Sequence, residues 1–486
     1  MGILNNLEPK NIWSYFEQIT QVPRPSKKEE KMIAFLLNFA KVNSLEAYRD
    51  EIGNVLIKKS ATKGMENRKP VVLQSHMDMV CENNKDVEID FDNDPITPYI
   101  DGEWVKAKGT TLGADDGIGV AAQMAILTDD NIEHGPIECL FTVDEETGLT
   151  GASHIQENFF ESKILLNLDS EDEGEIFIGC AGGIDAIATF NIIKEKPEPG
   201  GIAYKLSVNG LKGGHSGDEI HKGLGNSNKI ANRFLFFITN EYDARLSYFD
   251  GGNKHNAIPR EAEFVFTIDP NTKVRLMDDF IKFKNDIKNE IILTEPGLNI
   301  ELNETEIPDL VINKDLQRRF TYSVYACPHG VFTWSPAIDG LVETSTNLAA
   351  VKFDDEKIKI VTSQRSSLES GKKDINNMVR AVFDLAGASV KSGDGYPGWA
   401  PNPNSEILKI AERSYEKLFG KKPVVRAIHA GLECGLFLEK YPDLDMISFG
   451  PTLRGVHSPD ERVEVKTVDM WWKHLLDILK NIPVKA

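Results

Sequence analysis

Several short apolar runs along the chain have the length of β-strands. Their residues are apolar at successive positions, which is typical of strands that a sheet buries on both faces. Between them, apolar residues recur every three or four positions, which predicts helices. The strands are expected at Val71–Gln74, Ile137–Val143, Ile164–Leu168, Val424–Ile428 and Met446–Phe449, and the helices at Asp116–Thr128, Leu432–Lys440 and Met470–Leu479. This alternation predicts an α/β domain.

The middle of the chain has a different pattern. Apolar and polar residues alternate there, which predicts half-exposed strands, and amphipathic helices separate these strands. The strands are expected at Tyr204–Val208, Glu263–Asp269, Asn347–Phe353 and Lys357–Thr362, and the helices at Asn226–Glu241, Val274–Ile292, Leu316–Ala326 and Ile375–Leu385. The pattern favours an α+β domain with antiparallel strands.

Two segments rich in Pro, Gly and charge mark the expected domain boundaries. They are Glu195–Gly201 and Lys391–Pro403. We therefore predict an α/β domain in two parts, residues 1–198 and 396–486, interrupted by an inserted domain of residues 199–395.

Composition and charge narrow the functional classes. The 486 residues are 41% hydrophobic and 27% charged, as in an ordinary globular protein, and the net charge of -20 disfavours binding to nucleic acid or to anionic membranes. No apolar run approaches the ~20 residues of a membrane span, and the N-terminus does not resemble a signal peptide. The five cysteines include no CxxC pair. These features predict a cytoplasmic protein and argue against a thiolate zinc site.

Acidic and histidine residues gather where the predicted strands end. Taken singly, each has an ordinary explanation as a turn residue, a helix cap or a solvated surface group. Taken together, they form a nitrogen and oxygen ligand set at one edge of an α/β sheet, which suits zinc, with cobalt or manganese as competitors. Two cations close together require a shared carboxylate. The residues are His76, Asp78, Asp115, Asp116, Asp144, Glu145, Glu146, Asp169 and His457.

Two pairs within this set have spacings that suggest roles. In extended backbone His76 and Asp78 point the same way, so Asp78 can accept the imidazole N–H while the other ring nitrogen binds metal. Glu145 and Glu146 are neighbours that tend to point apart. One of them can bind metal while the other serves as a general base.

At these residues the sequence resembles the M20 family of metallopeptidases, in particular its aminoacyl-histidine dipeptidase branch. The matching pieces occur in the family's order between residues 75 and 463: SHMDMV, GTTLGADDGIG, DEETGLTGA, LNLDSED, GGHSG, HNAIP and GVHSPDERV, with HAGLECGLF typical of the branch. The resemblance implies a zinc-peptidase-type mixed sheet flanked by helices, with the inserted α+β domain as a lid. It also implies two Zn²⁺ ions per subunit, for which Co²⁺ or Mn²⁺ can substitute.

The resemblance implies a role for each residue. Asp115 would bridge the two metals across a cis peptide bond to Asp116. The other roles would be as follows: His76 and Asp169 complete one metal site, Glu146 and His457 complete the other, Glu145 is the general base, Asp78 orients His76, His215 stabilises the oxyanion, Asn256 holds the substrate, Arg365 and the Gly431 backbone bind the α-carboxylate, and Glu433 binds the amino group. Without the resemblance, the glycines around His215 favour a simple turn, and Arg365 reads equally as a surface ion pair.

The expected function is hydrolysis of short peptides, Xaa-His and other dipeptides. A deacylase of N-acyl amino acids is the alternative within the enzyme class, because it uses nearly the same metal site. A metal-binding module without activity is the alternative outside it, although no ligand or base is missing. The resemblance also implies a homodimer, in which His215 acts either within its own chain or across the interface.

Overall fold

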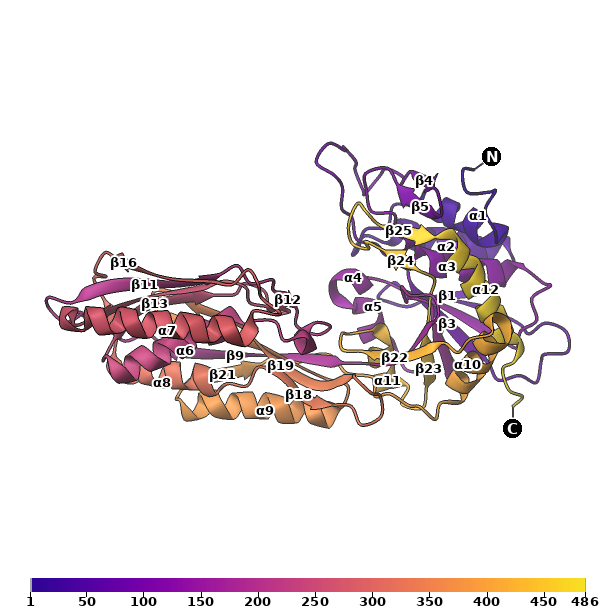
Figure 1. Ribbon diagram of the computed structural model, residues 1–486. Coiled ribbons are helices and arrows are strands. Elements are labelled where there is room, and N and C mark those ends of the chain that lie inside the picture. Colours follow the sequence, from indigo (N-terminus) through magenta and orange to yellow (C-terminus); the bar gives the residue numbers. More distant parts are fainter. Residues whose placement is uncertain (1, 486) are drawn as a thin grey trace. The chain divides into compact units, whose positions relative to one another are not determined.

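The computed structural model describes residues 2–485, which divide into two compact units (Figure 1). Unit 1 contains residues up to 180, residues 399–427 and residues from 432 onward. Unit 2 contains Ala181–Gly398 and Ile428–Gly431. The chain therefore passes from one unit to the other four times.

Unit 1 is built on an eight-stranded mixed sheet with the order β1-β2-β6-β3-β7-β23-β8-β22. Its central strands β6, β3, β7 and β23 pair in parallel and are buried almost throughout, as their continuous apolarity predicts. Parallel neighbours end at the same edge, so the residues that follow them lie close together. The strands are β1 (Glu46–Arg49), β2 (Val55–Lys59), β3 (Val71–His76), β6 (Ile137–Thr142), β7 (Ile164–Asn167), β8 (Glu175–Cys180), β22 (Val424–Ile428) and β23 (Asp445–Ser448).

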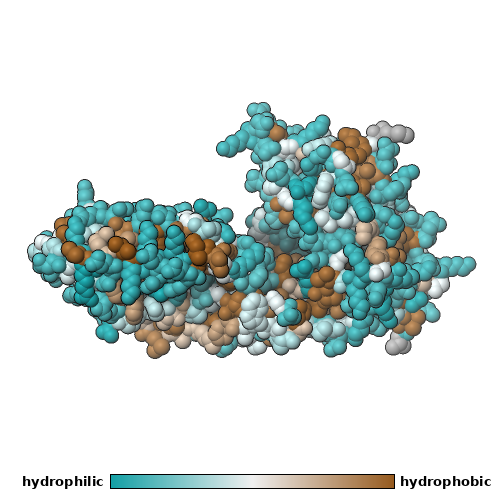
Figure 2. Space-filling model, viewed as in Figure 1, coloured by the Kyte–Doolittle hydropathy of each residue, from teal (hydrophilic) through white to brown (hydrophobic). Residues whose placement is uncertain are grey.

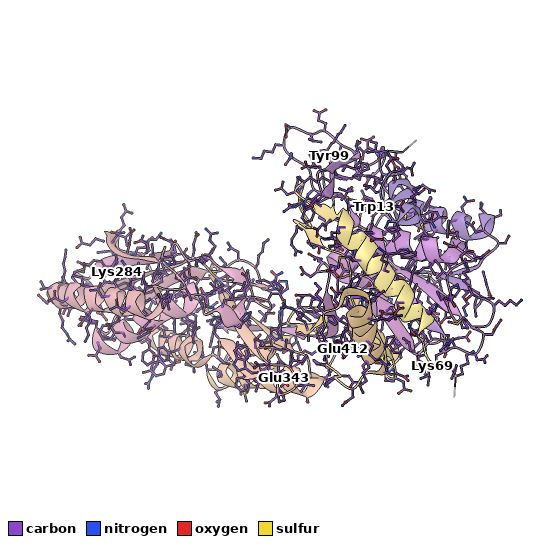
Figure 3. All side chains as sticks on the ribbon, turned by 45° about the vertical axis from the view of Figure 1, so that its right-hand side comes forward. Trp13, Lys69, Tyr99, Lys284, Glu343 and Glu412 are labelled. Atoms are coloured by element: carbon purple, nitrogen blue, oxygen red, sulfur yellow. The ribbon has the colours of Figure 1, made fainter. Side chains whose placement is uncertain are left out.

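Helices flank this sheet. Helix α3 packs on β3 and is covered by α1, whereas α10 packs on β23 and is covered by α12. The indole of Trp13, labelled in Figure 3, is fully buried on the inner face of α1. A small sheet of order β24-β25-β5-β4 completes the unit. The elements are α1 (Lys10–Ile19), α2 (Glu30–Val42), β4 (Pro98–Asp101), β5 (Trp104–Ala107), α3 (Ala114–Thr128), α4 (Glu145–Gly148), α5 (Thr150–Ser153), α10 (Glu406–Phe419), α11 (Glu433–Lys440), β24 (Leu453–Arg454), β25 (Arg462–Glu464) and α12 (Val465–Lys480).

Unit 2 is built on a nine-stranded antiparallel sheet. Its path is β16-β11-β15-β13-β19-β20-β9-β21, with β18 also paired to β19. Helices α6 and α9 pack on the sheet, and α8 packs on α6. The strands are β9 (Gly182–Asn191), β11 (Ile202–Asn209), β13 (Arg245–Gly251), β15 (Ala262–Ile268), β16 (Asn299–Thr305), β18 (Gly330–Trp334), β19 (Val342–Phe353), β20 (Lys357–Ser366) and β21 (Ser389–Ser392).

The remaining elements of unit 2 are four α-helices, two short 3₁₀ helices (η1, Ile220–Lys222, and η2, Pro270–Thr272) and two short strand pairs. The helices are α6 (Ser227–Glu241), α7 (Lys273–Ile291), α8 (Lys314–Ala326) and α9 (Glu369–Leu385). The strand pairs are β10 (Lys194–Glu195) with β17 (Val311–Ile312), and β12 (Gly214–His215) with β14 (Ala257–Ile258).

Each strand and helix expected from the hydrophobic pattern is present, with ends that differ by a few residues. The mixed α/β fold class is confirmed. The junctions between units lie elsewhere than the linkers suggested, after residues 180 and 398 rather than 198 and 395. The first difference arises because β9 pairs with β20 along its whole length and so belongs to the antiparallel sheet of unit 2.

The surface in view is mainly hydrophilic, with apolar residues in scattered patches (Figure 2). Within residues 2–485, no helix has both the length and the apolarity needed to cross a membrane.

Candidate metal centre and substrate-binding residues

Four side chains of unit 1 meet around a fifth, the carboxylate of Asp115. The Nε2 atom of His76 lies 3.1 Å from one oxygen of Asp115 and 3.5 Å from an oxygen of Asp169. The Nε2 atom of His457 lies 3.3 Å from the other oxygen of Asp115 and 2.9 Å from an oxygen of Glu146. Asp115 therefore presents one oxygen to each histidine, as a bridging ligand would.

Local structure brings these side chains together. His76 ends β3, and Asp169 stands two residues beyond the end of the adjacent parallel strand β7. Asp115 lies at the start of α3 with non-helical dihedral angles, and its peptide bond to Asp116 is cis, as the resemblance implied. His457 lies in the hairpin loop between β24 and β25.

The five side chains fit a pair of divalent cations. Ligand atoms of His76, Asp115 and Asp169 all lie within 4.8 Å of one another, and so do those of Asp115, Glu146 and His457. Among residues 2–485, one oxygen of Glu146 is buried and has no hydrogen-bond partner. Hydrogen bonds to Asp115 and Glu146 raise the pKa of His457 to about 11, so this end of the cluster already attracts positive charge. The donor set of imidazole nitrogens and carboxylate oxygens suits zinc and its neighbours.

Asp78 lies behind His76. Its carboxylate stands 3.4 Å from the Nδ1 atom of His76 and accepts hydrogen bonds from the Ser26 hydroxyl and from the backbone N–H groups of Glu145 and Glu146. Burial acts to raise the pKa of Asp78, but the contacts with His76 and Ser26 outweigh it and lower the pKa. One carboxylate therefore contacts both His76 and the start of α4.

Glu145 lies beside this cluster. Atoms of its carboxylate, of Glu146 and of His76 fall within 4.8 Å of one another. We expected the two glutamates to point apart because they are neighbours in the sequence. The structure places both at the start of α4, where successive side chains diverge by only ~100°. Burial raises the pKa of Glu145 well above its usual value, and the carboxylates of Glu433 and Glu146 act in the same direction.

In unit 2, His215 and Arg365 lie next to each other. Arg365 is 6% exposed, and its guanidinium donates to the Tyr396 hydroxyl at 3.0 Å. Its other terminal nitrogen lies 3.4 Å from Nε2 of His215. Asn256 immediately precedes β14, which pairs with the strand of His215, and its carbonyl accepts from the N–H of Ser216. The buried position of Arg365 contradicts its alternative reading as a surface ion pair.

Both ring nitrogens of His215 lie beside polar groups. The backbone N–H of Asp218 lies 3.2 Å from Nδ1 of His215, and the carboxylate of Asp218 lies 3.4 Å from the same atom. The Nε2 atom faces the Arg365 guanidinium, which can only donate. His215 therefore lies between a carboxylate and a guanidinium.

The two residues predicted from HAGLECG belong to different units. Gly431 lies in unit 2, where a Cβ atom at its position would stand 2.9 Å from the Tyr396 ring. Glu433 begins α11 in unit 1 and is 1% exposed. One of its oxygens accepts from Gln74 and Thr142, and the other has no partner in the described part of the chain. Burial raises the pKa of Glu433 to about 7.

Three residues around Arg365 were not predicted. Tyr396 accepts its hydrogen bond, Asp218 contacts His215, and His429 is buried with its Nε2 atom 2.7 Å from the Ser345 hydroxyl. Burial lowers the pKa of His429 to about 3, and Arg365 acts in the same direction, so this ring is neutral. His429 opens the HAGLECG motif and could have been found there, whereas nothing local in the sequence marks Tyr396 or Asp218.

Carboxylates and imidazoles around a shared aspartate, at the carboxyl ends of sheet strands, are an arrangement that metal-dependent hydrolases use. The chain belongs to peptidase family M20/M25/M40, whose sequence model matches residues 72–481. The family predicted from the motifs is thereby confirmed.

Relatives of known name span the whole chain. The chain is 44% identical over 486 residues, all of both proteins, to the cytosol non-specific dipeptidase of Escherichia coli strain K12. The crystal structure of aminoacylhistidine dipeptidase from Vibrio alginolyticus is 44% identical, with a TM-score of 0.95 over 100% of this chain and 99% of that one. The aminopeptidase PepT of Bacillus cereus, at 16% identity and a TM-score of 0.57 over 98% of this chain and 99% of that one, shares the fold.

Proposed function

We propose that the protein is a metal-dependent dipeptidase that hydrolyses Xaa-His and other dipeptides. The observation that carries the proposal is the cluster of five nitrogen and oxygen ligands around Asp115, with the Glu145 carboxylate beside it. The names of two full-length relatives, each 44% identical, support the choice of dipeptides.

The proposed cofactor is a pair of Zn²⁺ ions per subunit, with Co²⁺ or Mn²⁺ as substitutes. His76, Asp115 and Asp169 would hold one cation, and Asp115, Glu146 and His457 would hold the other. Such a pair lowers the pKa of a water molecule and polarises the scissile carbonyl group.

Glu145 is the proposed general base. Its carboxylate takes a proton from the attacking water and then delivers it to the leaving amine. Its raised pKa makes it a stronger base than an exposed carboxylate, which suits a group that accepts a proton and then donates it. Asp78 keeps His76 and the start of α4 in place while this transfer occurs.

The groups of unit 2 bind the substrate in this proposal. His215 donates a hydrogen bond to the oxyanion as the carbonyl becomes tetrahedral, and Asn256 helps to hold the substrate. Arg365 pairs with the α-carboxylate, because a guanidinium fork matches its two oxygens, and the Gly431 backbone assists. In unit 1, the oxygen of Glu433 that has no partner among residues 2–485 takes the amino group. Groups for both ends of the substrate would restrict it to two residues.

Two further features complete the proposal. The cytosol is the proposed location, in keeping with the name of the Escherichia coli relative. A homodimer is the proposed assembly, and sedimentation of the purified protein tests it.

A dipeptide panel with metal analysis tests the function. The purified protein is assayed with Ala-His, β-Ala-His, Ala-Ala, the tripeptide Ala-Ala-His and N-acetyl-histidine, and its zinc, cobalt and manganese contents are measured. We expect cleavage of dipeptides, little of the tripeptide, and close to two metal ions per chain. Release of acetate from N-acetyl-histidine in preference to dipeptide cleavage would instead indicate a deacylase. A protein without divalent metal that also ignores added metal would contradict the proposal.

A further inference from the structure

One buried carboxylate connects the loops that carry two of the proposed ligands. Glu461 is 2% exposed and accepts four backbone N–H groups in succession, those of residues 112–115. One oxygen takes Leu112 at 2.7 Å and Gly113 at 3.0 Å, and the other takes Ala114 at 2.7 Å and Asp115 at 3.3 Å. The last of these N–H groups belongs to the shared aspartate itself.

Glu461 also belongs to the loop of His457. That loop runs between β24 and β25, and both Gly455 and His457 have left-handed backbone conformations in it, with φ of 68° and 60°. The imidazole is 52% exposed, so little packing holds it. Glu461 follows four residues later, and its N–H donates to the carbonyl of Ser458 at 3.0 Å. The carboxylate therefore anchors the exposed ligand loop to the segment that carries Asp115.

Arg24 holds the same segment from the other side. This buried guanidinium donates to the carbonyl of Gly113 at 2.5 Å and to those of Met77 and Asp78 at 3.1 and 2.7 Å. A Cβ atom at Gly113 would lie 2.5 Å from Arg24. The Asp115 segment thus gives its N–H groups to one charged side chain and a carbonyl to another, which leaves it little freedom to shift.

Glu138 is a second buried carboxylate that accepts backbone N–H groups, and it lies away from the proposed ligands. Glu138 is 5% exposed and accepts the backbone N–H groups of Glu161 and Ser162, together with the Ser162 hydroxyl. That loop carries none of the proposed ligands. Glu138 therefore provides a matched control for the stability that a buried, multiply bonded carboxylate contributes.

We infer that Glu461 is a positioning residue that couples Asp115 to His457 and thereby sets the affinity of the cation site formed by Asp115, Glu146 and His457. The site of His76, Asp115 and Asp169 depends less on Glu461. His76 ends β3 and Asp169 follows β7, and Glu461 contacts neither of these strands of the central sheet. The inference rests on the proposed function only in treating these five side chains as ligands of two cations.

Zinc binding to the full-length apoprotein tests the inference. Wild type, Glu461→Gln and Glu138→Gln are stripped with a chelator and titrated with Zn²⁺ by calorimetry in the presence of a competing chelator. In Glu461→Gln an amide N–H₂ replaces one oxygen and faces two N–H donors. Loss of a supporting group of this kind costs ~10–100-fold in metal affinity, which we expect at one of the two sites, with a much smaller change at the other. Glu138→Gln should lower the melting temperature and leave both affinities unchanged.

The outcomes separate this inference from the proposed function. The inference is overturned if Glu461→Gln and Glu138→Gln bind zinc with equal affinities, or if Glu461→Gln weakens both sites equally. A wild type that binds fewer than two zinc ions would also overturn it. If Glu461→Gln does not fold, Glu461→Asp is titrated, because it keeps the charge but reaches fewer of the four N–H groups. If neither folds while Glu138→Gln does, Glu461 acts on stability and the inference fails. A wild type that binds two zinc ions yet cleaves no dipeptide contradicts the proposed function alone.

Discussion

Replacement of Glu145 by glutamine removes the proposed base while keeping its size and shape. Within residues 2–485, the Glu145 carboxylate takes part in no hydrogen bond or ion pair, and the N–H of residue 145, which donates to Asp78, is unaffected. The folded state therefore loses no internal bond. The substitution also removes one negative charge from a buried group of carboxylates that repel each other. We expect a melting temperature for the apoprotein equal to or above that of the wild type.

The effect on turnover should be large by comparison. Removal of a general base costs ~10²–10⁴-fold in rate, or about 3–5 kcal/mol in the activation free energy. The value of kcat for Ala-His should fall by this factor, while KM changes by only a few-fold because Glu145 is not a proposed substrate-binding group. Release of histidine, measured by chromatography, gives kcat, and calorimetry gives the zinc affinity.

A matched control isolates the chemistry. Glu416→Gln changes an exposed glutamate of α10 in the same unit and should leave kcat unchanged. Retention of more than a tenth of the wild-type kcat in Glu145→Gln, with both zinc ions bound, would show that another group moves the proton. Loss of zinc from the same variant would instead make Glu145 a ligand.

Three other predictions concern binding, metal and pH. Arg365→Lys keeps the charge but loses the guanidinium fork, so KM for Ala-His should rise at least tenfold with a smaller change in kcat. The preference of the enzyme for Ala-His over its C-terminal amide should also disappear. An unchanged preference would show that Arg365 does not bind the carboxylate. EDTA should abolish dipeptide cleavage, and added Zn²⁺, Co²⁺ or Mn²⁺ should restore it; activity that survives complete removal of metal would exclude the proposed cofactor. Burial lowers the pKa of His474 in the folded protein to about 4, whereas the same imidazole has a pKa of about 6.5 in the unfolded chain. Between these two pH values only the unfolded chain binds the proton. Titration of His474 therefore leaves the free energy of unfolding unchanged above pH 6.5 and lowers it by up to about 3 kcal/mol as the pH falls towards 4. The melting temperature of His474→Gln should consequently fall less between pH 7 and 5 than that of the wild type, and identical slopes would contradict the assignment.

The local pattern of the sequence was sufficient to predict the elements and the sheet edge. Runs such as Ile137–Val143 are apolar at most positions because the strand they form, β6, is buried on both faces. The end of each such strand is therefore visible as the first acidic residue or histidine after an apolar run. Since parallel strands end at one edge, the sequence alone placed His76 and Asp169 together.

The order of the motifs predicted the family. The acidic residues and histidines at the strand ends predicted the cluster around Asp115. Other features depend on contacts between residues far apart in sequence. Glu461 and Arg24 bond to the backbone of residues 77–78 and 112–115, and backbone groups leave no trace in the side-chain pattern of their partners. Tyr396 could not be found from the sequence either, because its side chain bonds to that of Arg365, which lies 31 residues away.

The sequence by itself determined which residue types stand at the ends of which strands, because hydrophobic periodicity is a short-range property that burial imposes on each element separately. Only the tertiary structure decided that Asp115 presents one oxygen to each histidine, that both glutamates of α4 face the cluster, and that Gly431 and Glu433 belong to different units. Such relations depend on the path of the backbone through turns and hairpin loops. That path is set by the packing of the whole chain rather than by any one segment.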